Sequence, residues 1–300
     1  MTGEGLFERI ETSLGVSIHE EVRRIAARLA QENAAAAVLF YGSNLRTGSL
    51  DGVLDFYVLT DGPPTERIWP RIGYREFESE AGTLRAKIAI MTFDRFARAA
   101  RGQSRDTTIW TRFVQPAALA YSASERQRQR VVHALADAVR TATRLAAALG
   151  PESGTPDEYW RALFRATYTA EFRVETPGRE NSIIEANRAH FDGLLPQGWQ
   201  ADDIAYRKEG DELHTQLSGS RKAQILDWWR ARRRIGKPLN ILRLAKATTT
   251  FEGAARYAAW KLERHTGLKL EVTPFRERHP LLAMPGAAFE LWAKRRNRQR

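Results

Sequence analysis

Two apolar segments, Val38-Leu39-Phe40-Tyr41-Gly42-Ser43 and Gly52-Val53-Leu54-Asp55-Phe56-Tyr57-Val58-Leu59-Thr60-Asp61, decide the fold expected for this chain. Both are rich in the aliphatic and aromatic residues of β-strands, and a polar loop joins them. Gly42 lacks a side chain, so backbone N–H groups there can approach phosphate oxygens, and Ser43 adds a hydroxyl donor. Asp55 supplies a hard oxygen ligand on the second strand. The two segments predict a site for a nucleoside triphosphate and its Mg²⁺.

The second strand carries one acid where a two-metal nucleotidyl-transfer site would carry two, at positions i and i+2. Val53 and Tyr57 occupy the positions on either side of Asp55 that share its face. Asp51 and Asp61 have the right parity, but at about 3.3 Å per residue they lie roughly 13 and 20 Å away, so a metal reaches them only if the chain bends. A second interpretation therefore stays open, in which the Gly-Ser pair is only a tight turn.

Lys87 is a charged residue inside the apolar segment 84–91. A lysine on such a strand can neutralise triphosphate charge as pyrophosphate leaves. The alternative is an edge-strand lysine whose stem lies on apolar surface and whose ammonium reaches water. Both interpretations remain open on the sequence alone.

The composition is that of a globular protein with a strong excess of basic residues. The 300 residues include 47 Lys and Arg against 36 Asp and Glu, a net charge of +11, and no cysteine. The positive charge favours polyanionic partners, namely nucleic acid, an anionic membrane surface or phosphorylated substrates. The absence of cysteine excludes disulfides and thiolate metal sites. With no signal peptide evident and no apolar run long enough to span a bilayer, we expect a cytoplasmic location.

Hydrophobic periodicity predicts an α/β first half and a mostly helical second half. A cluster of Gly, Pro and Ser at 150–156 predicts a boundary between domains 1–150 and 151–300. We expect helices at 18–33, 93–100, 108–114, 125–149, 157–175, 182–195, 221–234, 240–247 and 251–265, and strands at 36–41, 53–60, 75–80, 84–91 and 117–121.

The C-terminal segment 287–298 places Phe289 and Trp292 beside a cluster of Lys and Arg. A short helix of this kind can lie on an anionic bilayer with its aromatic rings among the headgroups. A packed terminal helix with a charged tail is the alternative.

In order along the chain, these motifs resemble the translocator assembly and maintenance family, the peripheral phosphatidate cytidylyltransferases of mitochondria and some bacteria. The resemblance rests on a Tyr-Gly-Ser turn, an Asp-Phe strand with a later Asp, a strand lysine, a tryptophan-containing helix and a Tyr-x-x-x-hydrophobic-Arg segment followed by Asn. Ala117-Ala118-Leu119 stands where the family has Gly-Arg-Leu, so an expected phosphate-binding arginine is missing there. The matching residues are Tyr41, Gly42, Ser43, Asp55, Asp61, Lys87, Trp110, Tyr168, Arg173 and Asn181.

The resemblance implies an α+β protein with a nucleotidyltransferase-fold domain containing a mixed sheet, followed by a mostly helical, winged-helix-like domain. It implies CTP and Mg²⁺ as reactants and a basic C-terminal helix that meets the inner membrane surface. Its nucleotide site would comprise Tyr41, Gly42, Ser43, Lys87, Arg173 and Asn181, with Asp55 and Lys87 in catalysis and Asp55 and Asp61 as metal ligands.

We therefore expect an enzyme that transfers CMP from CTP to phosphatidic acid, giving CDP-diacylglycerol. Two alternatives remain. One is nucleotidyl transfer to a soluble, protein or RNA acceptor, and the other is an inactive nucleotidyltransferase fold that binds nucleic acid.

Overall fold

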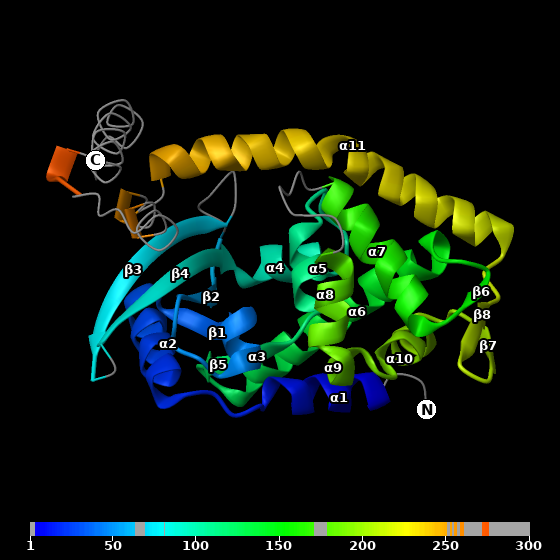
Figure 1. The fold of residues 1–300 in the computed structure, drawn as a ribbon, viewed down its shortest axis with the longest axis horizontal. Helices are drawn as coiled ribbons and strands as arrows, with labels where there is room; N and C mark the ends of the chain where they lie inside the picture. Colours follow the sequence, from blue (N-terminus) through cyan, green and yellow to red (C-terminus); the bar gives the residue numbers. More distant parts are fainter. Residues whose placement is uncertain are drawn as a thin grey trace, which may run out of the picture.

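A mixed sheet of five strands forms one end of the protein (Figure 1). The computed structural model describes residues 4–63, 70–80, 82–170, 179–250, 253, 255–256, 259–260 and 272–275. The spatial order of the strands is β3-β4-β2-β1-β5; β2 and β4 are parallel, and all other neighbours are antiparallel. These features confirm the expected α+β fold. The strands are β1 (Ala35–Tyr41), β2 (Val53–Thr60), β3 (Arg71–Ser79), β4 (Gly82–Thr92) and β5 (Ala117–Ser122).

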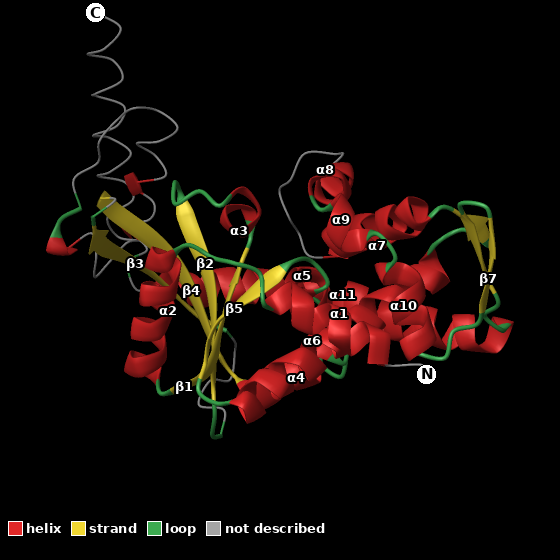
Figure 2. Cartoon of the chain, turned by 90° about the horizontal axis from the view of Figure 1, so that it is seen from below, coloured by secondary structure: helices red, strands yellow, loops and turns green. Residues whose placement is uncertain are grey.

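Alternate residues of the strands enter two separate hydrophobic layers. Helix α2 (Glu20–Asn33) covers one face, where Ile25 and Leu29 belong to the same buried cluster as Phe40 and Phe56. Figure 2 shows α2 on one side of the sheet and the helical body of the molecule on the other. The sheet is therefore buried on both faces, as the near-continuous apolar runs of β1 and β2 predict.

Three helices and their loops cover the second face of the sheet. They are α4 (Phe93–Ala100), α5 (Thr108–Phe113) and α6 (Glu125–Leu149), close to the predicted ranges. The side chain of Ser124 caps α6 by accepting from the backbone N–H of Gln127 at 3.3 Å. Helix α1 (Glu4–Leu14), which the sequence analysis did not predict, packs along α6.

The second half adds five helices among the described residues, with a small sheet. The helices are α7 (Pro156–Ala170), α8 (Arg179–Ala186), α9 (Arg188–Phe191), α10 (Leu194–Ala201), and the long α11 (Gly219–Thr250), together with isolated helical residues near 255, 259 and 274. The small sheet has the order β6-β8-β7, from β6 (Ser153–Gly154), β7 (Tyr206–Glu209) and β8 (Glu212–Thr215). The β7–β8 hairpin, which turns at Gly210 with a φ of 59°, was not predicted.

Two predicted helix boundaries are wrong. The single helix expected at 182–195 is broken, because Gly193 adopts a left-handed φ of 69° between α9 and α10. Conversely, α11 runs through Pro238, where a break was expected. Packing outweighs the lost backbone hydrogen bond there: Gly236 sits so close to the carbonyl of Ala170 on α7 that a β-carbon would not fit.

The buried core continues across the proposed domain boundary at residue 150. Helix α6 contacts α7, α10 and α11, and one buried cluster includes Leu39 of the sheet, Trp160 of α7 and Trp199 of α10. The boundary thus separates two sheets without separating two hydrophobic cores. Most of the helix expected at 251–265 lies outside the described residues.

The described helices offer no candidate for a membrane-spanning segment, since none joins sufficient length to sufficient apolarity. The basic segment 287–298, predicted to lie on a membrane, is outside the described residues.

Candidate functional site

Tyr41, Asp55 and Lys87 form a row across three adjacent strands. Tyr41 of β1 lies directly opposite Asp55 of β2, and Asp55 lies directly opposite Lys87 of β4. Residues in register on neighbouring strands present their side chains on the same face of a sheet. The row therefore places a phenol, a carboxylate and an ammonium group side by side, on the face that the helical body covers.

The row lies in a cavity of about 450 Å³ at the end of β1. Five residues of the predicted nucleotide and metal site line this cavity: Tyr41, Gly42, Ser43, Asp55 and Lys87. The sequence analysis thus found the residues that the fold brings together on the sheet side of the cavity.

Gly42 is required by geometry at the turn after β1. Its φ of 92° is one that side-chain-bearing residues rarely adopt, and a β-carbon there would lie 3.0 Å from Oδ2 of Asp55. The backbone of the turn therefore approaches the carboxylate closely, which only glycine allows. Ser43 follows as the first residue of the short helix α3 (Ser43–Thr47).

The side chain of Asn44 holds the loop after this turn in place. It is buried, and its amide donates to the carbonyls of Ser49 and Asp51 at 2.8 and 2.7 Å. These bonds fold the loop 48–52 back onto α3 ahead of β2. Asn44 therefore has a structural task in this loop.

Asp55 is held in a desolvated setting with cationic neighbours. Burial raises the pKa of Asp55 above its usual value of 3.8, while the charges of Lys87 and Arg112 act in the opposite direction. A carboxylate in this environment gains from any further cation that reaches it, since the charged form is the one that burial penalises.

Arg112 of α5 is a charged cavity residue that the sequence analysis missed. It lines the cavity, donates to the hydroxyl of Tyr41 at 2.8 Å, and its guanidinium carbon lies 5.1 Å from the centre of the Tyr41 ring. The available signal was the one used for Lys87: a charge inside an apolar segment, here between Trp110 and Phe113. Arg112 thus adds a cation to the cavity from a helix rather than from the sheet.

The second half of the chain closes the cavity. Tyr168 of α7 and residues of α8 and its C-terminal end form the wall opposite the sheet, namely Ser182, Ile183, Ala186 and Asn187. Among the described lining residues, the charged groups are three cations, Arg46, Lys87 and Arg112, and one carboxylate, Asp55. This excess of positive charge suits a ligand with several anionic oxygens.

Two residues of the predicted site, Asp61 and Asn181, do not line this cavity. Asp61, at the far end of β2, accepts hydrogen bonds at 2.8 Å from both Arg130 and Gln127. Asn181 is exposed, and its side-chain oxygen accepts from Nε of Arg161 at 2.9 Å. Arg173 lies outside the described residues.

The described residues contain no group of three or more His, Asp or Glu side chains that could hold a metal ion. Glu76 of β3 pairs with Arg85 of β4 at 3.5 Å. Mg²⁺ in nucleotide sites is commonly held by one or two carboxylates, with substrate phosphates and water completing its shell. Asp55 fits that arrangement as the single protein ligand of an ion that arrives with the nucleotide.

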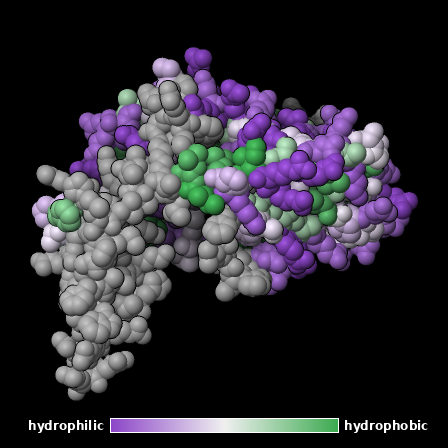
Figure 3. All heavy atoms as spheres, turned by 90° about the horizontal axis from the view of Figure 1, so that it is seen from above, coloured by the Kyte–Doolittle hydropathy of each residue, from purple (hydrophilic) through white to green (hydrophobic). Residues whose placement is uncertain are grey.

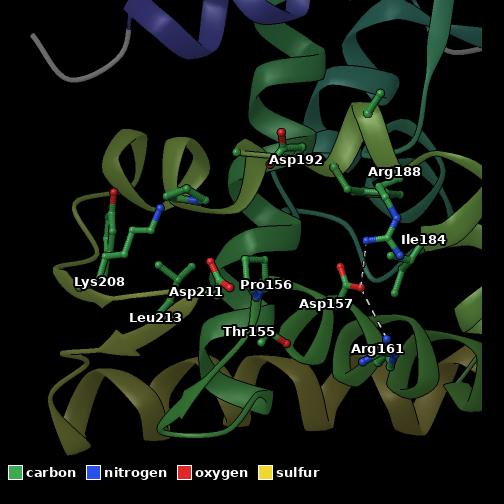
Figure 4. Close-up of a pocket in the computed structure, with 15 residues that line it drawn as sticks. Thr155, Pro156, Asp157, Arg161, Ile184, Arg188, Asp192, Lys208, Asp211 and Leu213 are labelled. Atoms are coloured by element: carbon green, nitrogen blue, oxygen red, sulfur yellow. Dashed lines mark ion pairs between the residues drawn. The ribbon is translucent and has the colours of Figure 1, made fainter.

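A larger cavity of about 960 Å³ is lined by residues of α7, α8, α9 and the β7–β8 hairpin (Figure 4). Its charged groups are mixed, and Asp157 is already neutralised by Arg161 at 3.5 Å and Arg188 at 3.8 Å. None of the residues predicted from the sequence to bind nucleotide lines it. The cavity between the sheet and α8 is therefore the better candidate site.

Comparison with known proteins adds no family assignment: no protein-family model matches the chain. No curated protein matches it either.

Proposed function

We propose that the protein is a nucleotidyltransferase that transfers CMP from CTP to the phosphate of an anionic lipid, phosphatidic acid. One observation carries the proposal: the Tyr41–Asp55–Lys87 row lies beneath the Gly42 turn, in a cavity that Arg112 also lines. The resemblance stated above supplies the choice of CTP and phosphatidic acid. It also supplies the proposed nucleotidyltransferase fold for the sheet and the winged-helix-like fold for the second half.

The roles of the residues follow from their chemistry. Asp55 would hold Mg²⁺, which supplies charge stabilisation at the α-phosphate when bound with the nucleotide. The backbone at Gly42 and the hydroxyl of Ser43 would bind triphosphate oxygens. Lys87 and Arg112 would offset the charge that accumulates on the pyrophosphate as it leaves.

The reaction needs no dedicated general base. An oxygen of the lipid phosphate, already anionic near pH 7, forms a bond to the α-phosphorus of CTP. The bond between the α-phosphorus and the oxygen bridging to the β-phosphorus breaks, and that oxygen keeps the electron pair in the leaving pyrophosphate. Binding and orientation of two anions are then the protein's main contribution.

The test is incubation with CTP, Mg²⁺ and phosphatidic acid vesicles, with release of pyrophosphate and formation of CDP-diacylglycerol as readouts. We expect both products from the wild-type protein and neither from the Asp55→Asn or Lys87→Met proteins. Asp61→Asn is the matched control, since it removes an acid that directly follows the same strand and does not line the cavity. Silence with CTP, UTP, ATP and GTP alike would overturn the proposal.

The single carboxylate of the cavity favours a second candidate. A site with three cations and one acid is also suited to binding a nucleotide or nucleic acid without catalysis. In that case the protein would bind Mg²⁺·CTP or an oligonucleotide, and would release no pyrophosphate under any condition above.

A further inference from the structure

Helix α11 presents a row of basic side chains to solvent. Arg230, Arg233, Arg234 and Lys237 are all exposed. Their spacing of three, four and seven residues places them on one face of a helix with 3.6 residues per turn. We call these residues, together with the exposed Ile241 and Leu242, the outer face of α11.

The charges of this face are poorly neutralised. Arg230 pairs with Asp227. Arg233, Arg234 and Lys237 have no acidic partner among the described residues, and the segment 228–243 contains no Asp or Glu. By contrast, exposed arginines of α2 are paired, Arg24 with Glu21 and Arg28 with Glu32, both at 2.9 Å. The outer face is thus a local concentration of uncompensated positive charge.

Apolar side chains continue the row where the charges end. Ile241, one turn beyond Lys237, is 57% exposed. Its neighbour Leu242 is 50% exposed and lies about 100° further round the helix. Figure 3 looks onto the side of the molecule over which α11 runs, and shows apolar residues bordering hydrophilic ones there. Exposed aliphatic residues next to unpaired cations are the composition of a surface that meets both headgroups and acyl chains.

The opposite side of α11 is firmly packed, which keeps this face outward. Trp229 is buried, and the indole N–H of Trp228 donates to the carbonyl of Gly102 at 3.1 Å. The guanidinium of Arg232 donates to the same carbonyl. The helix therefore cannot turn its cations inward without breaking these contacts.

We propose that the outer face of α11 docks the protein on an anionic lipid bilayer. Arg233, Arg234 and Lys237 would lie among the anionic headgroups, each contributing about 1 kcal/mol near such a surface. Ile241 and Leu242 would enter the boundary between headgroups and acyl chains. These two side chains favour a bilayer over nucleic acid, whose phosphate backbone offers them no apolar surface. Docking of this kind needs neither CTP nor Mg²⁺, so it stands or falls apart from the proposed reaction.

The experiment is co-sedimentation of the full chain with vesicles, without nucleotide, at 0.05, 0.15 and 0.5 M NaCl. One set of vesicles contains phosphatidylcholine alone. The other also contains roughly 30% of an anionic lipid, which gives the vesicle surface a negative potential. The test variant is Arg233→Gln/Arg234→Gln/Lys237→Gln. The matched control is Arg23→Gln/Arg24→Gln/Arg28→Gln, which removes the same charge from exposed positions on α2.

We expect the wild-type and control proteins to bind anionic vesicles and the test variant to bind about 100-fold more weakly, from three lost contributions of about 1 kcal/mol. Ile241→Ser/Leu242→Ser should weaken binding without changing its salt dependence. Circular dichroism shows whether each variant is folded, and an unfolded triple variant is replaced by the single Lys237→Gln protein, expected to bind about fivefold more weakly.

Equal binding by the wild-type and test proteins would overturn the proposal, as would equal loss in the test and control variants. It would also be overturned if the test variant lost binding to a 20-nucleotide single-stranded DNA while vesicle binding was unchanged. Vesicle binding without product formation would leave this docking surface standing and reject the proposed reaction. Product formation in detergent micelles without vesicle binding would support the proposed reaction and reject the docking surface.

Discussion

Arg243 of α11 forms a buried ion pair with Asp106, with nitrogen–oxygen distances of 2.9 and 2.6 Å. Asp106 also accepts from the backbone N–H and the hydroxyl of Thr108, at 2.9 and 2.8 Å, in the first turn of α5. The same helix carries Arg112 into the cavity. Helix α11 thus fixes the start of α5 through the carboxylate of Asp106, and α5 supplies the cavity with Arg112.

Arg243→Met should destabilise the protein strongly, because it leaves the carboxylate of Asp106 buried without its cation. The side chain of Asp106 is only 1% exposed. We expect the free energy of unfolding in urea to fall by about 3–5 kcal/mol. Arg130→Met is the control: its pair with Asp61 is between side chains 32% and 50% exposed, so a loss below about 1 kcal/mol is expected. Similar losses in both variants would contradict this account.

Local patterns predicted the strands that build the site. The apolar runs of β1 and β2, the Gly-Ser turn and the charged residue in β4 are all short-range features, and each lies where it was expected. The pairing of β2 with β4, which sets Asp55 against Lys87, is a long-range contact that no local pattern specifies. Arg112 was missed for the same reason, since only the docking of α5 on the sheet brings it to Tyr41.

The second half was less predictable because tertiary packing decides its element boundaries. Pro238 ordinarily ends a helix, yet α11 is held on both sides of it, by the contact of Arg232 with Gly102 and by the ion pair of Arg243 with Asp106. The β7–β8 hairpin consists mainly of exposed polar residues, so it lacks the alternating pattern by which strands are recognised.

Gly42→Ala should disturb the site more than a strained glycine elsewhere. The added methyl would lie 3.0 Å from the Asp55 carboxylate, in a backbone conformation with positive φ. Gly48→Ala is the matched control, since Gly48 also has a positive φ, of 67°, but has nothing within 4 Å of the added carbon. Both changes should lower the free energy of unfolding by about 1–2 kcal/mol. Only Gly42→Ala should weaken binding of Mg²⁺·CTP in calorimetry; equal weakening by both would contradict the close approach.

Asp55→Asn should stabilise the protein in a pH-dependent way. Because burial raises the pKa of Asp55 above 3.8, the folded state keeps a proton that the unfolded state has already lost as pH rises. The free energy of unfolding of the wild type therefore falls between pH 3.8 and the raised pKa, and the loss persists at higher pH. The Asp55→Asn protein is free of this loss. Urea unfolding should show it to be more stable than the wild type at pH 7, with the difference shrinking towards pH 3.8.

The opposite outcome would carry a definite meaning. Suppose that the stability of the Asp55→Asn protein relative to wild type is lower at pH 7 than at pH 4. The charges of Lys87 and Arg112 would then outweigh burial in their effect on the pKa of Asp55. Asp61→Asn serves as the exposed control and should show no gain at pH 7, because it loses an ion pair.

Arg112→Gln should weaken binding of inorganic pyrophosphate, the ligand that tests the cation cluster without catalysis. A hydrogen bond to a charged group contributes about 1.5–3 kcal/mol, so an increase in Kd of roughly 10- to 100-fold is expected by isothermal titration calorimetry. Tyr41→Phe keeps the cation and removes only the hydroxyl that accepts from Arg112 at 2.8 Å. Tyr41→Phe should raise the Kd for pyrophosphate less than Arg112→Gln does. A larger increase for Tyr41→Phe would show that the phenol, and not the guanidinium, recognises pyrophosphate.

The unbroken core across residue 150 means that the two walls of the cavity belong to one cooperative unit. The sheet wall carries Asp55, the opposing wall comes from α7 and α8, and both rest on α6, whose buried side chains contact each half. A ligand therefore does not enter this cavity by the opening of a hinge between two independently folding domains. Fragments cut near residue 150 should fail to refold alone, and the intact chain should melt in a single transition.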